Sequence, residues 1–317
     1  MTPRPEFSRS QPPVASSDGR SLPHLPFLQN LFRKPRILLG VVFGAIVLLS
    51  VLTSPAQAIQ AQVQPTNPQL GDTLSVLIQT ASETSETPTV TLNSKTYPSF
   101  PTGPNRYRAL LPTTPLDRPG RLAIQVNSGG DVSNLAVNLR GRSFPTQRIW
   151  VRGAGSDGTD HEFQRIDAFK ALETSEKYWQ GAFRRPSAGG VTTVYGVRRY
   201  YNGEFAQDYF HRGVDYAGSV GTPVVAPAAG RVVLVGREAD GFRLHGNTIG
   251  VDHGQGVSSI FIHLSRIDVR EGDFVQPGQR IGAIGATGSA TGPNLHWGLY
   301  VHGLAVDPVP WREQGFE

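Results

Sequence analysis

The chain contains no cysteine among its 317 residues and only one methionine. The absence of cysteine excludes a disulfide framework, a thiolate nucleophile and any metal site with sulfur ligands from cysteine. A metal site in this chain must therefore use histidine and carboxylate ligands. The 36 glycines and 25 prolines exclude a mainly helical bundle and are typical of a β-rich protein with many turns. The length is enough for about two domains.

The chain beyond its first 58 residues also lacks an excess of one charge, although the sequence pI is about 9.6. Six of the 30 basic residues and two of the 25 acidic residues lie within 1–58, so the remainder carries 24 basic and 23 acidic residues. A nearly neutral body does not offer the basic surface that neutralises a phosphate backbone. We therefore expect no nucleic-acid partner.

One long uncharged run lies near the N-terminus. Residues 37–52 carry no charge, follow the basic cluster 33–36 and precede an Ala-x-Ala pattern. This order is typical of an export segment, because positive flanks stay in the cytoplasm and small residues mark a cleavage site. We expect a Pro-rich, basic cytoplasmic tail over 1–36 and a transmembrane or signal segment over 37–58. Cleavage and membrane anchoring both stay open. In either case the rest of the chain is exported and lies in the periplasm, free or anchored to the inner membrane.

Residues 59–142 show short apolar-alternating runs separated by turn residues, which predicts a small β-sandwich of immunoglobulin-like type. The expected strands are 73–79, 89–92, 106–111, 121–126 and 132–139. This region contains no histidine, so we interpret it as a spacer or docking module without catalytic residues.

Residues 143–188 are predicted to form a helical connector. Thr159 and Glu162 have the spacing of a capping box, and apolar residues follow at helical spacing as far as Leu172. We expect one amphipathic helix that begins at this box and ends within 174–180.

Residues 189–317 are predicted to form a compact antiparallel β domain. Of the 36 glycines, 23 lie between positions 189 and 315, among valine-rich runs. The expected strands include 231–235, 248–252, 257–263 and 295–301. The predicted fold class is therefore mainly β, with a membrane segment, a small sandwich, a helical connector and this C-terminal domain.

Six of the eight histidines lie between positions 211 and 302, and some of them form a candidate metal site. His211, Asp215 and His296 make a set of two imidazoles and one carboxylate, which a catalytic zinc ion takes with its fourth position left to water. In a straight strand the α-carbons of His211 and Asp215 would be about 13 Å apart, so the chain must bend, and Gly213 permits this. The alternative is that these side chains are scattered hydrogen-bonding groups.

Strand alternation assigns faces to the candidate residues. On strand 295–301 it places His296 on the face without bulky apolar groups. His263, expected to end strand 257–263, shares a face with Phe261 and can point into the same cleft.

Several blocks across 189–307 resemble, in order and spacing, the lysostaphin/LytM-type zinc metallopeptidases. The blocks are 209–215, 221–230, 246–254, 261–265, 275–278 and 282–297. They include His211-x-x-x-Asp215 and Asn294-x-His296. The resemblance implies a β-sheet groove that binds one Zn²⁺ ion and cleaves peptide cross-links of bacterial cell wall.

The resemblance also implies roles for single residues. By motif, His211, Asp215 and His296 are the zinc ligands. His263 matches the histidine that assists the metal-bound water and shuttles its proton. Asn294 stands where the family has a catalytic histidine, and an amide cannot carry a proton between pH 5 and 8.

The function implied by this resemblance is that of a zinc metalloendopeptidase acting on peptidoglycan stem peptides in the periplasm. Tyr209, Arg212 and Tyr216 are its candidate substrate contacts, with a purely structural role as the alternative. Asn294 supports a different function, that of a weakened or inactive relative that binds peptidoglycan or activates another hydrolase. A regulatory cell-wall protein is then a candidate partner. A passive structural or adhesion protein resting on the sandwich is the third class.

Overall fold

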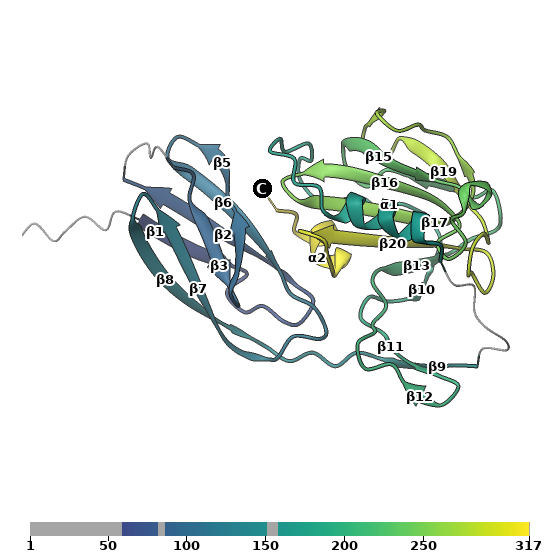
Figure 1. Cartoon of the computed structure of the whole chain (residues 1–317), viewed down its shortest axis with the longest axis horizontal. Helices are drawn as coiled ribbons and strands as arrows, with labels where there is room; N and C mark the ends of the chain where they lie inside the picture. Colours follow the sequence, from purple (N-terminus) through teal and green to yellow (C-terminus); the bar gives the residue numbers. More distant parts are fainter. Residues whose placement is uncertain (1–58, 82–85, 151–157, 317) are drawn as a thin grey trace, which may run out of the picture. The chain divides into compact units, whose positions relative to one another are not determined.

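The computed structural model describes residues 59–81, 86–150 and 158–316. The predicted tail 1–36 and the predicted export segment 37–58 lie outside these residues. No helix in the described part is both long and apolar enough to cross a membrane. The described chain is mainly β, as the sequence predicts, and nearly all of its strand pairs are antiparallel (Figure 1).

Residues 59–81 and 86–139 form two four-stranded antiparallel sheets that share one hydrophobic core. The first sheet has the order β1 (Ile59–Gln64), β2 (Thr73–Thr80), β6 (Arg106–Pro112) and β5 (Phe100–Gly103). The second has the order β4 (Lys95–Pro98), β3 (Thr89–Leu92), β7 (Gly120–Ser128) and β8 (Asp131–Leu139). All five predicted strands are present, and β7 shows the expected alternation, with Leu122, Ile124 and Val126 buried. The immunoglobulin-like type and the boundary at residue 142 remain predictions.

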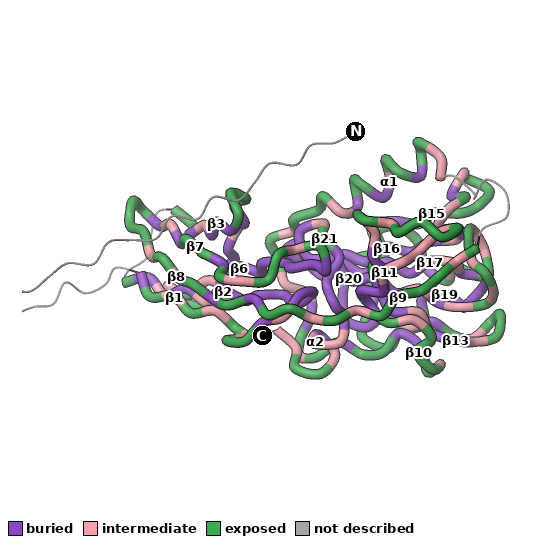
Figure 2. The backbone as a smooth tube through the Cα atoms, turned by 90° about the horizontal axis from the view of Figure 1, so that it is seen from below, coloured by how far each residue is buried: buried purple, intermediate pink, exposed green. Residues whose placement is uncertain are grey.

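A ten-stranded sheet carries the C-terminal half. Its main path runs β10 (Val191–Thr193), β13 (Val214–Ala217), β20 (Asn294–Val301), β17 (Val257–Ile267), β16 (Asn247–Gly254), β15 (Gly230–Gly236) and β18 (Phe274–Val275). Beside this path lie β14 (Pro223–Val225), β19 (Arg280–Ile284) and β21 (Leu304–Val306), and the described helical turns are η1 (Glu238–Asp240) and α2 (Pro308–Glu313). Buried residues concentrate along β16, β17 and β20 (Figure 2), so these strands form the buried centre of the domain.

The predicted helix is present as α1 (Asp160–Lys170), and its capping box has formed. Thr159 Oγ1 accepts from the Glu162 backbone N–H at 3.1 Å. The helix ends before the predicted 174–180, because that segment pairs in extended form with the end of β16. The Tyr178 backbone N–H, for example, donates to the His253 carbonyl at 3.0 Å.

Besides α1, the described part of the predicted connector 143–188 contains a strand that the sequence does not predict. Strand β9 (Thr146–Ile149) pairs in parallel with β11 (Arg198–Tyr201), and β11 pairs with β12 (Glu204–Phe205). β9 and β12 are largely exposed and β11 is half-buried, so none of the three carries an alternating apolar signal by which the sequence could reveal it.

A buried arginine joins the small two-sheet unit to the large sheet. Arg108 lies on β6 and is 1% exposed. Its guanidinium donates to Gln255 Oε1 at 2.7 Å and to the Phe316 carbonyl at 3.1 Å. The same group lies 5.2 Å from the centre of the Trp179 ring. Because charge-assisted bonds in a buried setting are strong, this side chain ties the orientation of β6 to the large sheet.

The Arg108→Ala substitution is expected to lower the free energy of unfolding by about 2–3 kcal/mol, because Gln255 and a carbonyl lose a buried donor. Denaturant unfolding followed by circular dichroism measures this loss. Arg106→Ala is the matched control on the same strand, since Arg106 donates to Gln79 at the exposed surface. It should change stability by less than about 0.5 kcal/mol. Equal effects of the two substitutions would contradict the assignment.

Candidate metal centre

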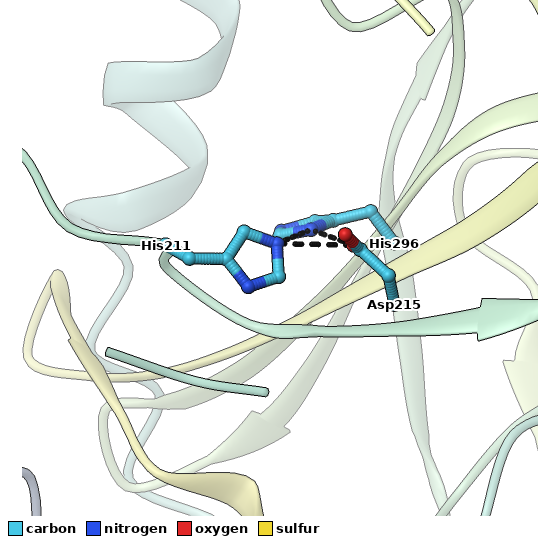
Figure 3. A group of neighbouring side chains, drawn as sticks. All are labelled: His211, Asp215 and His296. Atoms are coloured by element: carbon cyan, nitrogen blue, oxygen red, sulfur yellow. Dashed lines mark hydrogen bonds and ion pairs between the residues drawn. The ribbon is translucent and has the colours of Figure 1, made fainter. Parts of the chain in front are cut away.

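His211, Asp215 and His296 come together at one end of the large sheet (Figure 3). His211 Nε2 lies 3.0 Å from Asp215 Oδ1 and 3.0 Å from His296 Nδ1. His296 Nδ1 lies 2.8 Å from Asp215 Oδ1. In the described part of the chain this is the one group of three His, Asp or Glu side chains that converge closely enough to hold a metal ion.

Two strands and one loop position these side chains. Asp215 on β13 lies directly opposite His296 on β20 in the antiparallel register, so both side chains leave the same face of the sheet. His211 precedes β13 and is held by backbone bonds: its N–H donates to the Val197 carbonyl, and its carbonyl accepts from the Gly196 N–H. The three groups are therefore fixed by main-chain pairing.

Gly213 allows the bend between His211 and Asp215 by its small size. A Cβ atom at this position would lie 2.2 Å from the Trp297 carbonyl oxygen and 2.8 Å from His296 Nε2. Its φ is not among the positive values found in the chain, so close approach to β20 is what requires glycine here.

The hydrogen bonds around the cluster set its protonation. His211 Nδ1 lies 2.8 Å from the Val194 carbonyl and must donate to it, which assigns the proton to Nδ1 and leaves the Nε2 lone pair facing the cluster. Burial alone would raise the pKa of Asp215, but the adjacent imidazoles of His211 and His296 hold it well below its usual range. Burial lowers the pKa of His296. At neutral pH Asp215 is therefore a carboxylate and the His296 imidazole is neutral.

This donor set fits a zinc ion. The cluster joins three electron-pair donors, while only the His296 ring can supply a proton among them, so a cation at their centre satisfies all three. Ligand atoms on a tetrahedral zinc ion lie about 3.3 Å apart, given ligand distances of about 2.0–2.1 Å. The observed separations of 2.8–3.0 Å are close to this spacing. His211, Asp215 and His296 are thus the residues that would hold the ion.

The His263 side chain has a position that strand alternation does not predict. Strand β17 does not end at His263 but continues to Ile267. Phe261 lies opposite Trp297, which puts its face away from His296, and simple alternation would send His263 there as well. A register shift relative to β16 and a φ of 65° at His263 mark a β-bulge that re-aims the side chain.

The His263 ring is oriented by its Nδ1 atom, which donates to the Thr287 carbonyl at 2.8 Å. Its Nε2 atom is then unprotonated. Burial, followed by the charge of His296, lowers the pKa of His263 to about 4, so the imidazole is neutral at pH 7.

Asn294 begins β20, two residues before His296. Its backbone N–H donates to the Gly285 carbonyl at 3.1 Å. Its Oδ1 atom is buried and has no hydrogen-bond partner among the described residues. The amide is therefore available to a ligand at this end of the sheet.

The predicted substrate contacts differ in their surroundings. Tyr216 is fully buried, and its hydroxyl accepts from Arg312 at 3.0 Å, so its placement in the cleft is wrong; alternation turns it away from Asp215. Tyr209 is half-buried and accepts from Arg199 at 2.8 Å. Arg212 is exposed and lies over the Tyr209 ring. Contact of Tyr209 and Arg212 with substrate stays a prediction.

Buried Glu162 and half-buried His245 lie near the site and are functional candidates that the sequence does not reveal. Glu162 was interpreted only as a helix-capping residue, yet its carboxylate also binds His245 at 2.6 Å. His245 immediately precedes the Gly246-Asn247 motif, which is the one signal in the sequence that could have pointed to it.

The fold and the site define a class of mainly β protein in which a His-Asp-His cluster lies on an antiparallel sheet. The model of peptidase family M23 matches residues 209–308, which contain the whole cluster. The chain therefore carries a peptidase domain of family M23, of the lysostaphin/LytM type that the sequence motifs resemble.

Curated relatives match over the same region. The domain is 41% identical over 105 residues to an uncharacterized metalloprotease of Haemophilus influenzae, and the match covers 33% of this chain. It is 40% identical over 102 residues to the peptidoglycan DD-endopeptidase ShyA of Vibrio cholerae, covering 31% of this chain. It is 40% identical over 106 residues to lysostaphin of Staphylococcus simulans, covering 32%. The matched region spans only about a fifth of each relative, at 22%, 22% and 21%.

A solved structure is similar over more of the chain. The crystal structure of a putative peptidase M23 from Pseudomonas aeruginosa superposes with a TM-score of 0.56 at 25% identity. The superposition covers 79% of this chain and 96% of that one. The likeness thus extends beyond the matched domain and supports the mainly β architecture.

The Gly213→Ala substitution is expected to push β13 away from β20 and to lower the free energy of unfolding by about 1–3 kcal/mol, since a new Cβ overlaps the Trp297 carbonyl. Zinc affinity should fall as well, because His296 must shift. Thermal unfolding and a zinc titration measure the two effects. Gly190→Ala is the control, since a Cβ there meets no atom within 4 Å. Unchanged zinc affinity in Gly213→Ala would contradict the role given to this glycine.

Proposed function

We propose that the protein is a zinc metalloendopeptidase that cleaves peptide cross-links of peptidoglycan. The single observation that carries this proposal is the convergence of His211, Asp215 and His296 within a family M23 domain. The peptide substrate is supported by a relative whose name gives it as a peptidoglycan DD-endopeptidase. The stem peptides of the cell wall are the proposed partner.

The proposed ligands are His211, Asp215 and His296, with Zn²⁺ as the one cofactor. When bound, zinc lowers the pKa of a water molecule toward about 7 and polarises a carbonyl group. The chain itself keeps the three donor atoms in place through the β13–β20 register and the loop bonds of His211. Little reorganisation is then needed when substrate binds.

His263 and Asn294 are the proposed catalytic side chains beside this cluster. His263 carries an unprotonated Nε2, because its Nδ1 donates to Thr287, and so accepts a hydrogen bond from the attacking water. The Asn294 amide has a buried oxygen without a partner in the described chain and an amide group that donates. We assign it the binding of a polar group of the substrate near the scissile bond.

The place of action is part of the proposal. Residues 37–58 carry the pattern of an export segment, which agrees with a substrate that lies outside the cytoplasmic membrane. The two-sheet unit would then hold the peptidase domain at a distance from the membrane, and a cell-wall protein would regulate access.

Asn294 favours a second candidate function. Without an ionisable side chain at this position, proton transfer worth about 10²–10⁴-fold in rate depends on other groups. An inactive relative that binds peptidoglycan or activates another hydrolase is the resulting alternative. It differs from the proposed enzyme in releasing no muropeptides while still binding the cell wall.

The purified chain is expected to bind about one zinc ion and to release muropeptides from purified sacculi. His211→Ala or His296→Ala should abolish both, because each removes one of three protein ligands. Metal analysis and mass spectrometry of the released peptides measure the outcome and identify the bond. His161→Ala is the control, since His161 is exposed on α1.

Absence of zinc from the wild-type chain would contradict the metal proposal. Release by Asn294→His but not by the wild type would favour the inactive relative. Release by His296→Ala at the wild-type rate would show that the cluster is not the active site.

A further inference from the structure

The buried carboxylate of Glu162 accepts hydrogen bonds from the loop 243–245, which precedes β16. Glu162 is fully buried, and its Oε2 accepts from the backbone N–H groups of Arg243 at 3.0 Å and Leu244 at 3.1 Å. Its Oε1 accepts from the His245 backbone at 2.7 Å and from His245 Nδ1 at 2.6 Å. One carboxylate thus fixes both the main chain and the ring of His245.

This arrangement determines which edge of the His245 ring is free. With the proton on Nδ1 engaged by Glu162, the Nε2 atom carries a lone pair. That atom has no hydrogen-bond partner in the described part of the chain, and the side chain is 19% exposed. Burial raises the pKa of Glu162, but the bonds from the 243–245 loop outweigh it and lower the value overall. The carboxylate is therefore an anion at neutral pH.

His245 lies beside the metal centre. The His263 backbone N–H donates to the His245 carbonyl at 3.0 Å, so the loop before β16 lies beside His263 of β17. The loop after His245 is bound to Thr287, because the Asn247 N–H donates to Thr287 Oγ1 at 3.0 Å. The Thr287 carbonyl in turn holds the His263 ring. Charge on His245 lowers the pKa of both His263 and His296, which agrees with this proximity.

We propose that His245 is a second catalytic histidine of this site, positioned by Glu162, and supplies the proton transfer that Asn294 cannot perform. The inference rests on the proposed peptidase function and deepens it. A carboxylate behind an imidazole stabilises the imidazolium that forms when the ring takes a proton. The Nδ1 atom of His263, in contrast, donates to the Thr287 carbonyl, which is neutral. His245 is therefore the better proton acceptor, and His263 orients the water.

The step balances without a further reactant. As the water oxygen bonds to the scissile carbonyl carbon, one water proton passes to His245 Nε2. As the carbon–nitrogen bond breaks, that proton passes to the leaving nitrogen. One water is consumed, a carboxyl group and an amine are formed, and His245 returns to its neutral state.

The test compares four forms of the zinc-loaded full chain: wild type, His245→Gln, Asn294→His and the double variant. His245→Gln is expected to lower kcat by about 10²-fold with KM and bound zinc unchanged. Asn294→His should restore kcat at least tenfold in that background, because the substitution supplies an imidazole at the start of β20. Release of muropeptides from sacculi gives the rates, and metal analysis gives the zinc content.

His302→Gln is the matched control. His302 pairs with Glu173 through Nδ1 at 2.8 Å, a pair of the same chemistry at the opposite end of β20. Its loss should leave kcat unchanged. Glu162→Gln should lower kcat with KM unchanged, as expected of a positioning residue.

A second measurement does not depend on a variant that folds. Nitrogen-15 NMR of the wild-type chain should show the His245 ring protonated at Nδ1 alone near pH 7. A ring protonated at Nε2 would overturn the proposal, as would a kcat of His245→Gln within twofold of wild type. If both wild type and Asn294→His bind zinc but release nothing, the peptidase function itself is wrong and this inference falls with it.

Discussion

The antiparallel register of β13 and β20 is the constraint on which the site depends. It places Asp215 opposite His296, and a slip by one residue would turn one of the two side chains to the other face of the sheet. The register is itself fixed by burial on the other face, where Val214 pairs with Trp297 and Tyr216 with Leu295, all of them buried. The apolar core thus holds the polar cluster in place.

Two local departures from regular strands complete the cluster. Gly213 lets β13 approach β20 closely enough for His211 to turn back toward Asp215. The bulge at His263 brings a residue from the wrong face of β17 to the side of His296. Both are positions where a strained or tight backbone serves the site, and neighbouring strands hold each in place through hydrogen bonds.

The sequence alone predicts the regular parts and the chemistry of the ligands. Alternation located β7 and β20, the Thr159–Glu162 spacing located α1, and the absence of cysteine left histidine and carboxylate as the ligand types. The bulge at His263 could not be predicted, because the alternation rule assumes a regular strand and does not show where an extra residue is inserted. Strand β9 could not be predicted either, because its exposed side chains leave no periodic signal.

The contact between Glu162 and His245 is a part of the site that could not be predicted from the sequence. Within α1 it is a sufficient capping residue, so local reasoning gives it no further role. Glu162 and His245 are far apart in the sequence, so the sequence does not reveal that the same carboxylate also holds the 243–245 loop. One anion therefore closes the helix N-terminus and backs an imidazole beside the metal cluster. Because one buried carboxylate performs both tasks, its desolvation cost arises only once, and the helix start and the loop are expected to order together.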